Sequence, residues 1–365
     1  MRRTRPLLGL LMIAALLGAG ACTTTDPGTA STTSNATATA IGTEADLKAL
    51  EGVTVTEAPL SASPTASSST DATTPGTVPT ATATATATAT TTPAGTAPVL
   101  TLANTPLTVS ATTRRIVAAG SGPLSGPDSL VSAHLSVSLG STGQQLDSTY
   151  RLNEPVKLAM SNPETIAGLL TGLTGVQARS RVLVAIPPEE AYGSQGNPQV
   201  GISGTETLLV LADIVAVAAP LTQAEGSTVA PAAGLPTVTF DTTTGPTVTI
   251  PTGASPPTDT VAQLLVEGSG PPLASGQLVS VHYTGVLWKD GSVFDSSWAR
   301  KQPMAFPLGQ GQVIPAWDTQ LVGKKVGSRV LLVVPPKDGY GDAGSPPKIA
   351  GTDTLVFVID ILGAL

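Results

Sequence analysis

The sequence predicts an α+β fold made of two tandem copies of one domain, each an antiparallel sheet of about five strands with one short helix packed on it. Three observations support this. Four segments recur in the same order at an offset of 148 residues, or 147 for the last. Most of these segments have the alternation or the short apolar runs of strands, and one further stretch has helical spacing. The pairs are GSGPL/GSGPP (120–124 and 268–272), SAHLSVSL/SVHYTGVL (132–139 and 280–287), SRVLVAIPPEEAYG/SRVLLVVPPKDGYG (180–193 and 328–341) and GTETLLVLADIV/GTDTLVFVIDIL (204–215 and 351–362).

Three segments of the second copy are predicted to be strands. LVSVHYTGVL at 278–287 alternates and is rich in β-branched residues, and the Asp290-Gly291 pair just after it is typical of a hairpin turn. RVLLVV and DTLVFVIDIL are apolar runs of strand length. We expect Pro335 to end the first of these runs, because proline cannot donate a hydrogen bond within a sheet.

The helix is predicted within 313–323. Ile314, Trp317 and Leu321 have helical spacing, Pro315 lies near the start, where proline is tolerated, and Gly323 follows the end.

These elements divide the folded part of the chain into a first domain at 98–219 and a second at 234–365. Two weaker matching stretches, 98–109 and 236–250, lie upstream of each repeat. The residues between the domains, 220–233, are rich in Pro, Ala and Gly. We therefore expect a flexible linker there and two domains that move independently.

The N-terminus has the pattern of a targeting signal. MRRTR is basic and is followed by an apolar stretch too short for a comfortable membrane span, so residues 1–21 are predicted to be a signal peptide. The only cysteine, Cys22, follows a run of small residues, which resembles the lipobox of bacterial lipoproteins. This predicts lipidation at Cys22, with ordinary secretion as the alternative. Either reading places the chain outside the cytoplasmic membrane, and lipidation would anchor it to the outer face.

Residues 22–97 are mostly Thr, Ala, Ser and Pro. Such a composition buries too little apolar surface to offset chain entropy, so we expect a disordered stalk. The patch at 44–52, EADLKALEG, contains helix-forming residues, but nothing in the sequence ties it to a fold.

The charge pattern and the rare residue types exclude several functions. The net charge is −7 and neither repeat is basic, which argues against nucleic-acid binding. A single cysteine cannot form an intramolecular disulfide. The two histidines, His134 and His282, occupy the same place in each copy, so we predict a shared structural role. No group of Cys, His and carboxylate residues has the spacing of a metal site, and we expect neither metal nor cofactor.

Six short motifs of the second copy resemble those of a known family. VHYTG, FDSS, FPLG, VIPAW, PPKDGYG and TLVF occur in the order and spacing of FKBP-type peptidyl-prolyl cis-trans isomerases. The first copy resembles a degenerate member of that family. The arrangement of signal peptide, stalk and C-terminal domain resembles secreted isomerases of Actinobacteria. The resemblance implies a bent antiparallel sheet wrapped round a short helix in each of two FKBP-like domains.

The resemblance also implies a hydrophobic pocket. Its catalytic residues would be Tyr283, Phe294, Asp295, Ile314, Trp317, Tyr340 and Phe357, and its substrate-binding residues Arg300, Met304, Phe306, Val313 and Ile349. Trp317 would lie under the proline ring, with aromatic side chains as walls. Ile314 would offer its backbone N–H and Tyr340 its hydroxyl. Met304 stands where the family commonly has an aromatic residue, and Ser345 and Lys348 stand in a loop that is often His and Ile.

An apolar pocket suits this reaction because the twisted amide of the transition state has lost its resonance and is less dipolar than the planar one. The expected substrates are proline-containing exported polypeptides, and a macrolide inhibitor could occupy the same pocket. We expect a monomeric enzyme that acts as a foldase. Two alternatives remain open: a proline-peptide-binding module or holdase with incidental turnover, and a structural surface lipoprotein. On periodicity alone the aromatic residues could be core, and Asp295 could be a turn residue.

The first domain has lost most of the aromatic residues of this pocket. QLDSTY at 145–150 is the counterpart of VFDSSW at 293–298. The replacements at the offset positions are Leu135 for Tyr283, Leu146 for Phe294, Leu169 for Trp317 and Val210 for Phe357, whereas Asp147, Ile166 and Tyr192 keep the motif. We therefore expect the first domain to be inactive or very weak as an isomerase.

Overall fold

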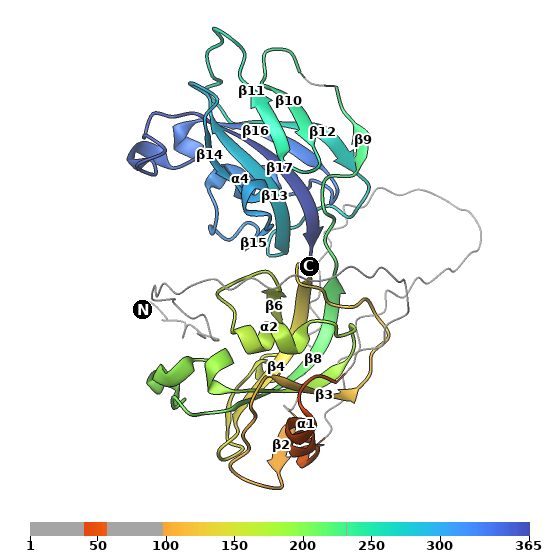
Figure 1. Cartoon of the computed structure of the whole chain (residues 1–365). Coiled ribbons are helices and arrows are strands. Elements are labelled where there is room, and N and C mark those ends of the chain that lie inside the picture. Colours follow the sequence, from red (N-terminus) through yellow and green to blue (C-terminus); the bar gives the residue numbers. More distant parts are fainter. Residues whose placement is uncertain (1–39, 57–97, 231) are drawn as a thin grey trace, which may run out of the picture.

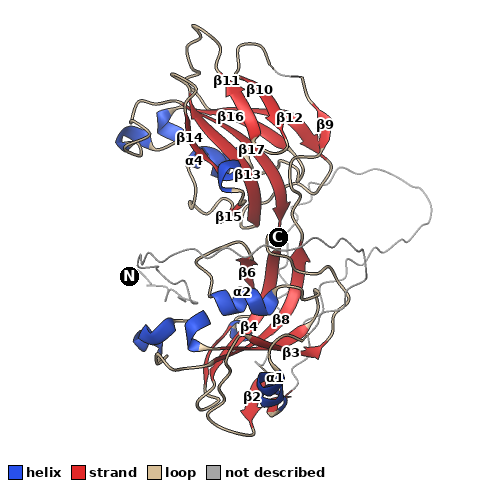
Figure 2. Cartoon of the chain, viewed as in Figure 1, coloured by secondary structure: helices blue, strands red, loops and turns tan. Residues whose placement is uncertain are grey.

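The computed structural model describes residues 40–56, 98–230 and 232–365, which form two antiparallel-sheet domains (Figures 1 and 2). The predicted α+β fold with two tandem domains is confirmed. The predicted signal peptide, Cys22 and most of the predicted stalk lie outside the described residues. Within the described ranges, no helix combines the length and the apolar character that crossing a membrane requires.

The first domain is a six-stranded sheet in the order β3-β7-β8-β4-β5, with β6 pairing with another part of β4. One helix, α2, packs on it. The elements are β3 (Thr113–Ala118), β4 (Leu130–Leu139), β5 (Gln145–Ser148), β6 (Val156–Ala159), α2 (Ala167–Leu173), β7 (Arg181–Ile186) and β8 (Leu208–Ala218), with 3-10 turns at Thr149–Arg151, Pro188–Glu190, Gly193–Gln195 and Pro198–Val200.

The second domain repeats this plan in a seven-stranded sheet, β14-β13-β17-β16-β12-β9, with β15 also pairing with β13. Its elements are β9 (Gly226–Thr228), β12 (Val261–Gly268), β13 (Leu278–Leu287), β14 (Val293–Ser296), α3 (Ser297–Arg300), β15 (Met304–Pro307), α4 (Pro315–Gln320), β16 (Arg329–Val334) and β17 (Leu355–Ala364), with 3-10 turns at Pro336–Asp338 and Gly341–Ala343. The sheets exceed the expected five strands because β6 and β15 pair beside the long central strands and β9 adds an edge.

The local predictions for this domain are confirmed. The turn between β13 and β14 contains Gly291 at φ +71°, and the Asp290 side chain accepts the Ser292 N–H at 2.9 Å. Strand β16 ends directly before Pro335, and α4 begins at Pro315. All ten residues of β13 are buried, because both faces of the sheet are covered.

Each sheet has two apolar faces with different covers. The helix and the loops around it cover one face, which forms the main core of each domain. A pair of antiparallel strands covers the other. In the second domain, β10 (Thr237–Asp241) pairs with β11 (Gly245–Thr249), and Val238 and Val248 pack over Leu331 and Val356.

The first domain obtains this second cover from the segment predicted to be a stalk, and there the prediction is wrong. Helix α1 (Glu44–Glu51) and strand β1 (Val53–Thr56) precede the low-complexity stretch, and β1 pairs with β2 (Val99–Leu102) beyond it. Leu50 is fully buried against Leu183 and Leu209. The buried Asp46 carboxylate accepts the Ser110 hydroxyl at 2.8 Å. These long-range contacts tie down a helix that is too short to be stable alone.

The predicted flexible linker at 220–233 is also wrong in its described part. Leu221 N–H donates to the Leu362 carbonyl at 2.9 Å, and Glu225 N–H donates to the Gly327 carbonyl at 2.9 Å. Strand β9 then pairs antiparallel with β12. The backbone of 221–228 is thus part of the second domain, since its polar groups are satisfied by that domain's sheet.

Candidate active site

A cavity of about 430 Å³ lies between α4 and the sheet of the second domain. All seven predicted catalytic residues line it. Its full lining is Tyr283, Phe294, Asp295, Met304, Gly311, Gln312, Val313, Ile314, Pro315, Trp317, Gly339, Tyr340 and Phe357. The chain therefore brings together residues from β13, β14, β15, α4 and β17 and from the loops beside them. An apolar cavity with a few convergent polar groups is the usual form of a small binding site.

Trp317 forms the base of this cavity. As a residue of α4 it is nearly buried, at 4% exposure. The ring of Tyr283 lies 5.1 Å from it at 82°, and that of Phe357 lies 5.3 Å from it at 83°. Phe294 meets Phe357 edge to face at 5.5 Å. Two rings standing nearly perpendicular to the indole make an aromatic cup, and edge-to-face pairs of this kind are favourable beyond their buried area.

One wall of the cup carries a charged group. The Tyr283 hydroxyl donates to the Asp295 carboxylate, and so does the Arg300 guanidinium. Arg300 also donates to the Tyr283 hydroxyl at 3.0 Å. This three-residue network fixes the Asp295 side chain beside the aromatic rings of the cavity.

The network sets the protonation states of its members. Burial alone would raise the pKa of Asp295, yet the hydrogen bonds from Tyr283 and Arg300 hold it below its ordinary value. Burial, reinforced by the hydrogen bond to Asp295, raises the pKa of Tyr283 to about 12. At neutral pH the carboxylate is therefore ionised and the phenol neutral.

A glycine makes room for the aromatic wall. A Cβ on Gly285 of β13 would lie 2.5 Å from Cζ of Phe294 and 3.0 Å from Cε1 of Phe357. Side chains do not approach so closely, so any other residue would push these rings out of place. The motifs do not reveal Gly285 as a site residue, but the repeat carries a signal, because the first domain has Val137 at the same position.

The loop at the rim is fixed to the cup by a lysine. Lys348 Nζ donates to the Phe294 carbonyl at 2.7 Å. Ser345 and Ile349 exchange two backbone hydrogen bonds, at 2.8 and 3.0 Å, which close the loop. Tyr340 lies at the mouth with 42% of its surface exposed, and burial of the rest, with the nearby Asp295 charge, raises its pKa.

Three predicted substrate-binding residues do not line the cavity. Arg300 lies behind Asp295. Phe306 is buried next to Trp317, with their ring centroids 5.6 Å apart, and Ile349 belongs to the core. The other two, Met304 and Val313, do line it. The short motifs do not distinguish residues that face the cavity from residues that support its walls. Only the packing in three dimensions shows which are which.

The two histidines are structural, as predicted. His282 Nδ1 lies 2.8 Å from the Ser297 hydroxyl and its ring stacks on Trp298. His134 has the same surroundings in Thr149 and Tyr150. The parts of the chain that the structure describes hold no cluster of three potential metal ligands.

The corresponding place in the first domain is filled by aliphatic side chains. Leu135, Leu146, Leu169 and Val210 all pack in its main core, together with Val137. Leu152 replaces Arg300 and is half exposed. Asp147 therefore lies without the tyrosine and arginine that hold Asp295.

Helix α2 also packs more closely on its sheet than a side chain would allow. A Cβ on Gly168 would lie 2.2 Å from Cγ2 of Ile186, and one on Gly172 would lie 2.4 Å from Cγ1 of Val184. At these positions α4 carries Ala316 and Gln320. Because the glycines remove the spacing side chains, the helix of the first domain rests directly on the sheet.

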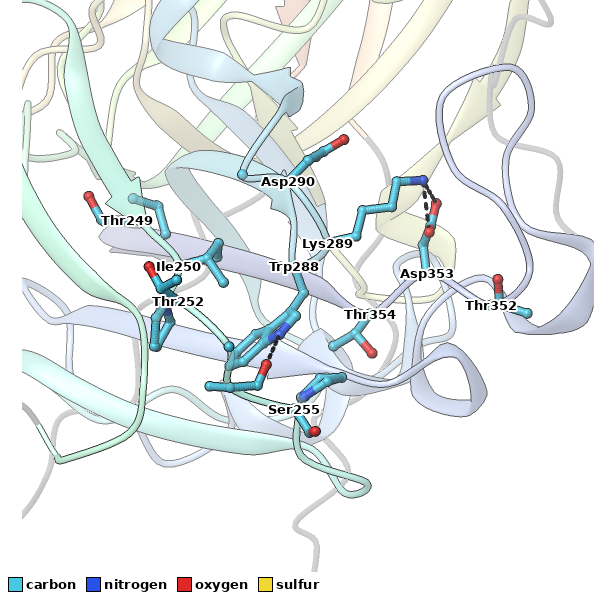
Figure 3. A pocket seen from close by; sticks show the side chains of 16 residues that line it. Thr249, Ile250, Thr252, Ser255, Trp288, Lys289, Asp290, Thr352, Asp353 and Thr354 are labelled. Carbon is cyan, nitrogen blue, oxygen red and sulfur yellow. Dashed lines mark hydrogen bonds and ion pairs between the residues drawn. The ribbon is translucent and has the colours of Figure 1, made fainter.

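A larger hollow of about 810 Å³ lies elsewhere in the second domain, between the loop after β11 and the β13–β14 turn (Figure 3). Trp288 lines it but is buried, and its indole N–H donates to the Ala254 carbonyl at 3.2 Å. Lys289 pairs with Asp353 at 2.9 Å. Trp288 is the only aromatic residue in its lining, so this hollow lacks the aromatic surface of the smaller cavity.

The family model for FKBP-type peptidyl-prolyl cis-trans isomerase matches residues 123–210 and 270–362, one segment in each domain. An FK506-binding protein of Streptomyces anulatus is 47% identical over 111 residues, which cover 30% of this chain and 90% of that protein. The chain belongs to the FKBP-type peptidyl-prolyl cis-trans isomerases. The resemblance inferred from the motifs is confirmed, and the chain is an isomerase of FKBP type.

Two further relatives match over shorter parts of their own length. The peptidyl-prolyl cis-trans isomerase FKBP15-1 of Arabidopsis thaliana is 53% identical over 87 residues, 24% of this chain and 56% of that protein. The mouse isomerase FKBP2 is 49% identical over 87 residues, 24% of this chain and 61% of that protein. A crystal structure of AtFKBP13 matches with 34% identity and a TM-score of 0.28, covering 29% of this chain and 93% of that chain.

Proposed function

We propose that the aromatic cup of the second domain catalyses the isomerisation and that the protein acts as a foldase on exported polypeptides. The observation that carries this proposal is the cup itself, in which Tyr283 and Phe357 stand perpendicular to Trp317 beside the Asp295 network. The proposed substrate is an X–Pro bond in an unfolded or partly folded chain, and the proposed acting form is a monomer.

The chemistry follows from the amide. The barrier to rotation is roughly 18–20 kcal/mol because the planar bond has partial double-bond character. The twisted transition state loses that resonance, so an apolar cavity that excludes water binds it better than the planar ground state. No bond to the protein forms or breaks, and the residues act by shape and polarity alone.

Each residue then has a distinct task. Trp317 supports the proline ring and Phe294 and Phe357 enclose it. Ile314, the residue before α4, offers its backbone N–H to the substrate carbonyl, and Tyr340 offers its hydroxyl at the mouth. The Asp295 carboxylate, held by Tyr283 and Arg300, faces the rotating carbonyl carbon. A macrolide with a ring that mimics the twisted amide would compete for the same cup.

We further propose that residues 1–21 direct export and that Cys22 carries a lipid, so that the enzyme works on the outer face of the cytoplasmic membrane. The basic start, the apolar stretch and the position of the lone cysteine support this. No nucleotide cofactor is needed for a reaction that proceeds by differential binding, which suits a compartment outside the cytoplasm.

The proposal is tested by separating turnover from binding in the full chain. Asp295→Ala should lower kcat for a proline peptide about tenfold or more while the Kd of the same peptide changes little, because the carboxylate acts mainly on the twisted state. Refolding of a proline-limited protein should slow in parallel. If kcat stays unchanged while Kd rises, the pocket serves a binding module instead and the enzymatic proposal for this site fails.

A further inference from the structure

The two domains are joined by almost no free chain. Strand β8 of the first domain ends at Ala218, and Leu221 already donates to the Leu362 carbonyl in the second domain. The next hydrogen bond follows at Ala224, whose N–H donates to Asp360 at 2.9 Å. Figure 1 shows the end of β8 beside the C-terminus, at the junction of the domains. So short a connection leaves the domains little room to separate.

An apolar contact fills this junction. Leu130 and Ala159 of the first domain are buried against Leu278 of the second, with Ala218 and Leu365 beside them. Leu130 and Leu278 occupy the same position of the repeat, as do Ala218 and Leu365. Equivalent patches therefore face each other, as in a twofold-symmetric dimer interface.

Two polar contacts lie at the edge of this junction. Lys157 Nζ donates to the Gly276 carbonyl at 2.8 Å, and Gln302 Nε2 donates to the Ser161 carbonyl at 2.5 Å. Gln302 follows Arg300 by two residues. Between them, Lys301 ends α3 with φ +54°, and the Gln302 N–H donates to the Ser297 carbonyl. Gln302 and Arg300 therefore lie on one short, hydrogen-bonded turn.

We propose that the first domain is a docked support for the active site: its Ser161 carbonyl holds Gln302, which positions Arg300 on Asp295 and Tyr283. The inference rests on the proposed function, because its catalytic readout is isomerase activity in the second domain. Gln302 is a positioning residue in this account, and the first domain contributes to turnover without a working cup of its own.

Docking is measured independently of activity. Spin labels on the exposed Thr142→Cys and Thr243→Cys, in the full chain with Cys22→Ser, report the distance between the domains. A single narrow distribution is expected, whereas a broad one would overturn the inference whatever the chain's activity. A chain with a narrow distribution but no turnover of any proline peptide would contradict the proposed function, and with it the catalytic support drawn here.

The link to Arg300 is tested by a double-mutant cycle in the full chain. Gln302→Ala should lower kcat/KM about two- to tenfold, and should cost nothing further once Arg300→Ala is present. The matched control is Gln263→Ala, since Gln263 makes the same kind of contact, to the Ala230 carbonyl at 3.1 Å, on strand β12. The acid limb of the pH profile should move to higher pH in Gln302→Ala, because a loosened Arg300 stabilises the Asp295 carboxylate less. An unchanged kcat/KM, or an equal loss in the presence and absence of Arg300, would overturn the inference.

Discussion

Gly285 and Phe294 share a space that only a glycine leaves open. A Cβ on Gly285 would lie 2.5 Å from the Phe294 ring, and the first domain has Val137 and Leu146 at these two positions. The second domain thus combines a very small residue with a large one, whereas the first domain has two residues of intermediate size. The two pairs have the same number of side-chain heavy atoms, but the aromatic wall is lost.

Gly285→Val in the full chain should therefore reduce kcat/KM on the order of a hundredfold, because it displaces two rings of the cup and small misplacements at a reacting site are costly. The cis/trans assay on a proline peptide measures this directly. Val137→Ala is the matched control in the first domain. It should lower that domain's stability by about 1 kcal/mol or more and leave kcat/KM unchanged. Wild-type activity in Gly285→Val would show that the rings of Phe294 and Phe357 are not part of the site.

The pH dependence follows from Asp295. Its pKa is held below the ordinary value by Tyr283 and Arg300, so the carboxylate is ionised from about pH 5 upward. We expect kcat/KM to stay flat from about pH 5 to 9 and to fall only in acid. Asp295→Asn should lower the plateau and remove the acid limb. An acid limb that persists in this variant would assign the titration to another group.

The network of Asp295, Tyr283 and Arg300 also makes the stability of the second domain depend on pH. A carboxylate whose pKa is lower in the folded state stabilises the fold above its unfolded pKa, and this contribution is lost as the pH falls through the folded pKa. Unfolding of the second domain followed in denaturant should show this loss below about pH 4 in the wild type and not in Asp295→Asn. If the wild type and Asp295→Asn lost the same stability in acid, the account of the Asp295 hydrogen bonds to Tyr283 and Arg300 would be contradicted.

The sequence predicts the repeats, the helix and the main strands, because those signals are local. The family resemblance carried by the short motifs identifies seven further residues, all of which line the cavity. The sequence does not predict the docking of 40–56, since Asp46 is held by Ser110, 64 residues away, and the low-complexity stretch between them hides the connection. The sequence does not predict that 221–228 joins the second domain for a similar reason: β9 is only three residues long, and its partner β12 begins at Val261.

The sequence does not separate the residues that line the site from those that support it. Phe306, Ile349 and Arg300 belong to the same motifs as the lining residues, and whether a side chain faces a cavity or backs a wall depends on packing in three dimensions. Gly285 and Lys348 show the converse. Their importance arises from contacts with Phe294 that a single position in the sequence does not reveal.

Leu50→Ala tests whether 40–56 completes the first domain. Leu50 is fully buried against the outer face of the sheet, so the free energy of unfolding of that domain should fall by about 2–5 kcal/mol. Lys48 is exposed on the same helix, so Lys48→Ala should change the free energy of unfolding by less than about 0.5 kcal/mol. Denaturant unfolding compares the two variants. If both behave alike, α1 does not contribute to the stability of the fold.

The proposed anchor is tested by Cys22→Ala. The wild-type chain should sediment with membranes and incorporate a labelled fatty acid, whereas the variant should be released and unlabelled, because one cysteine is the only thiol available. Release of the wild type into the medium would support ordinary secretion instead.

The central claim is that the chemistry resides in the aromatic cup of the second domain and not in its aliphatic counterpart. The most direct measurement is a protease-free cis/trans assay on the full chain with Phe294→Leu, beside Leu146→Ala at the same position of the first domain. We expect Phe294→Leu to lose about tenfold or more in kcat/KM, because it removes an edge-to-face pair that encloses the substrate, and Leu146→Ala to keep wild-type activity. Wild-type activity in Phe294→Leu, or an equal loss in Leu146→Ala, would contradict the account.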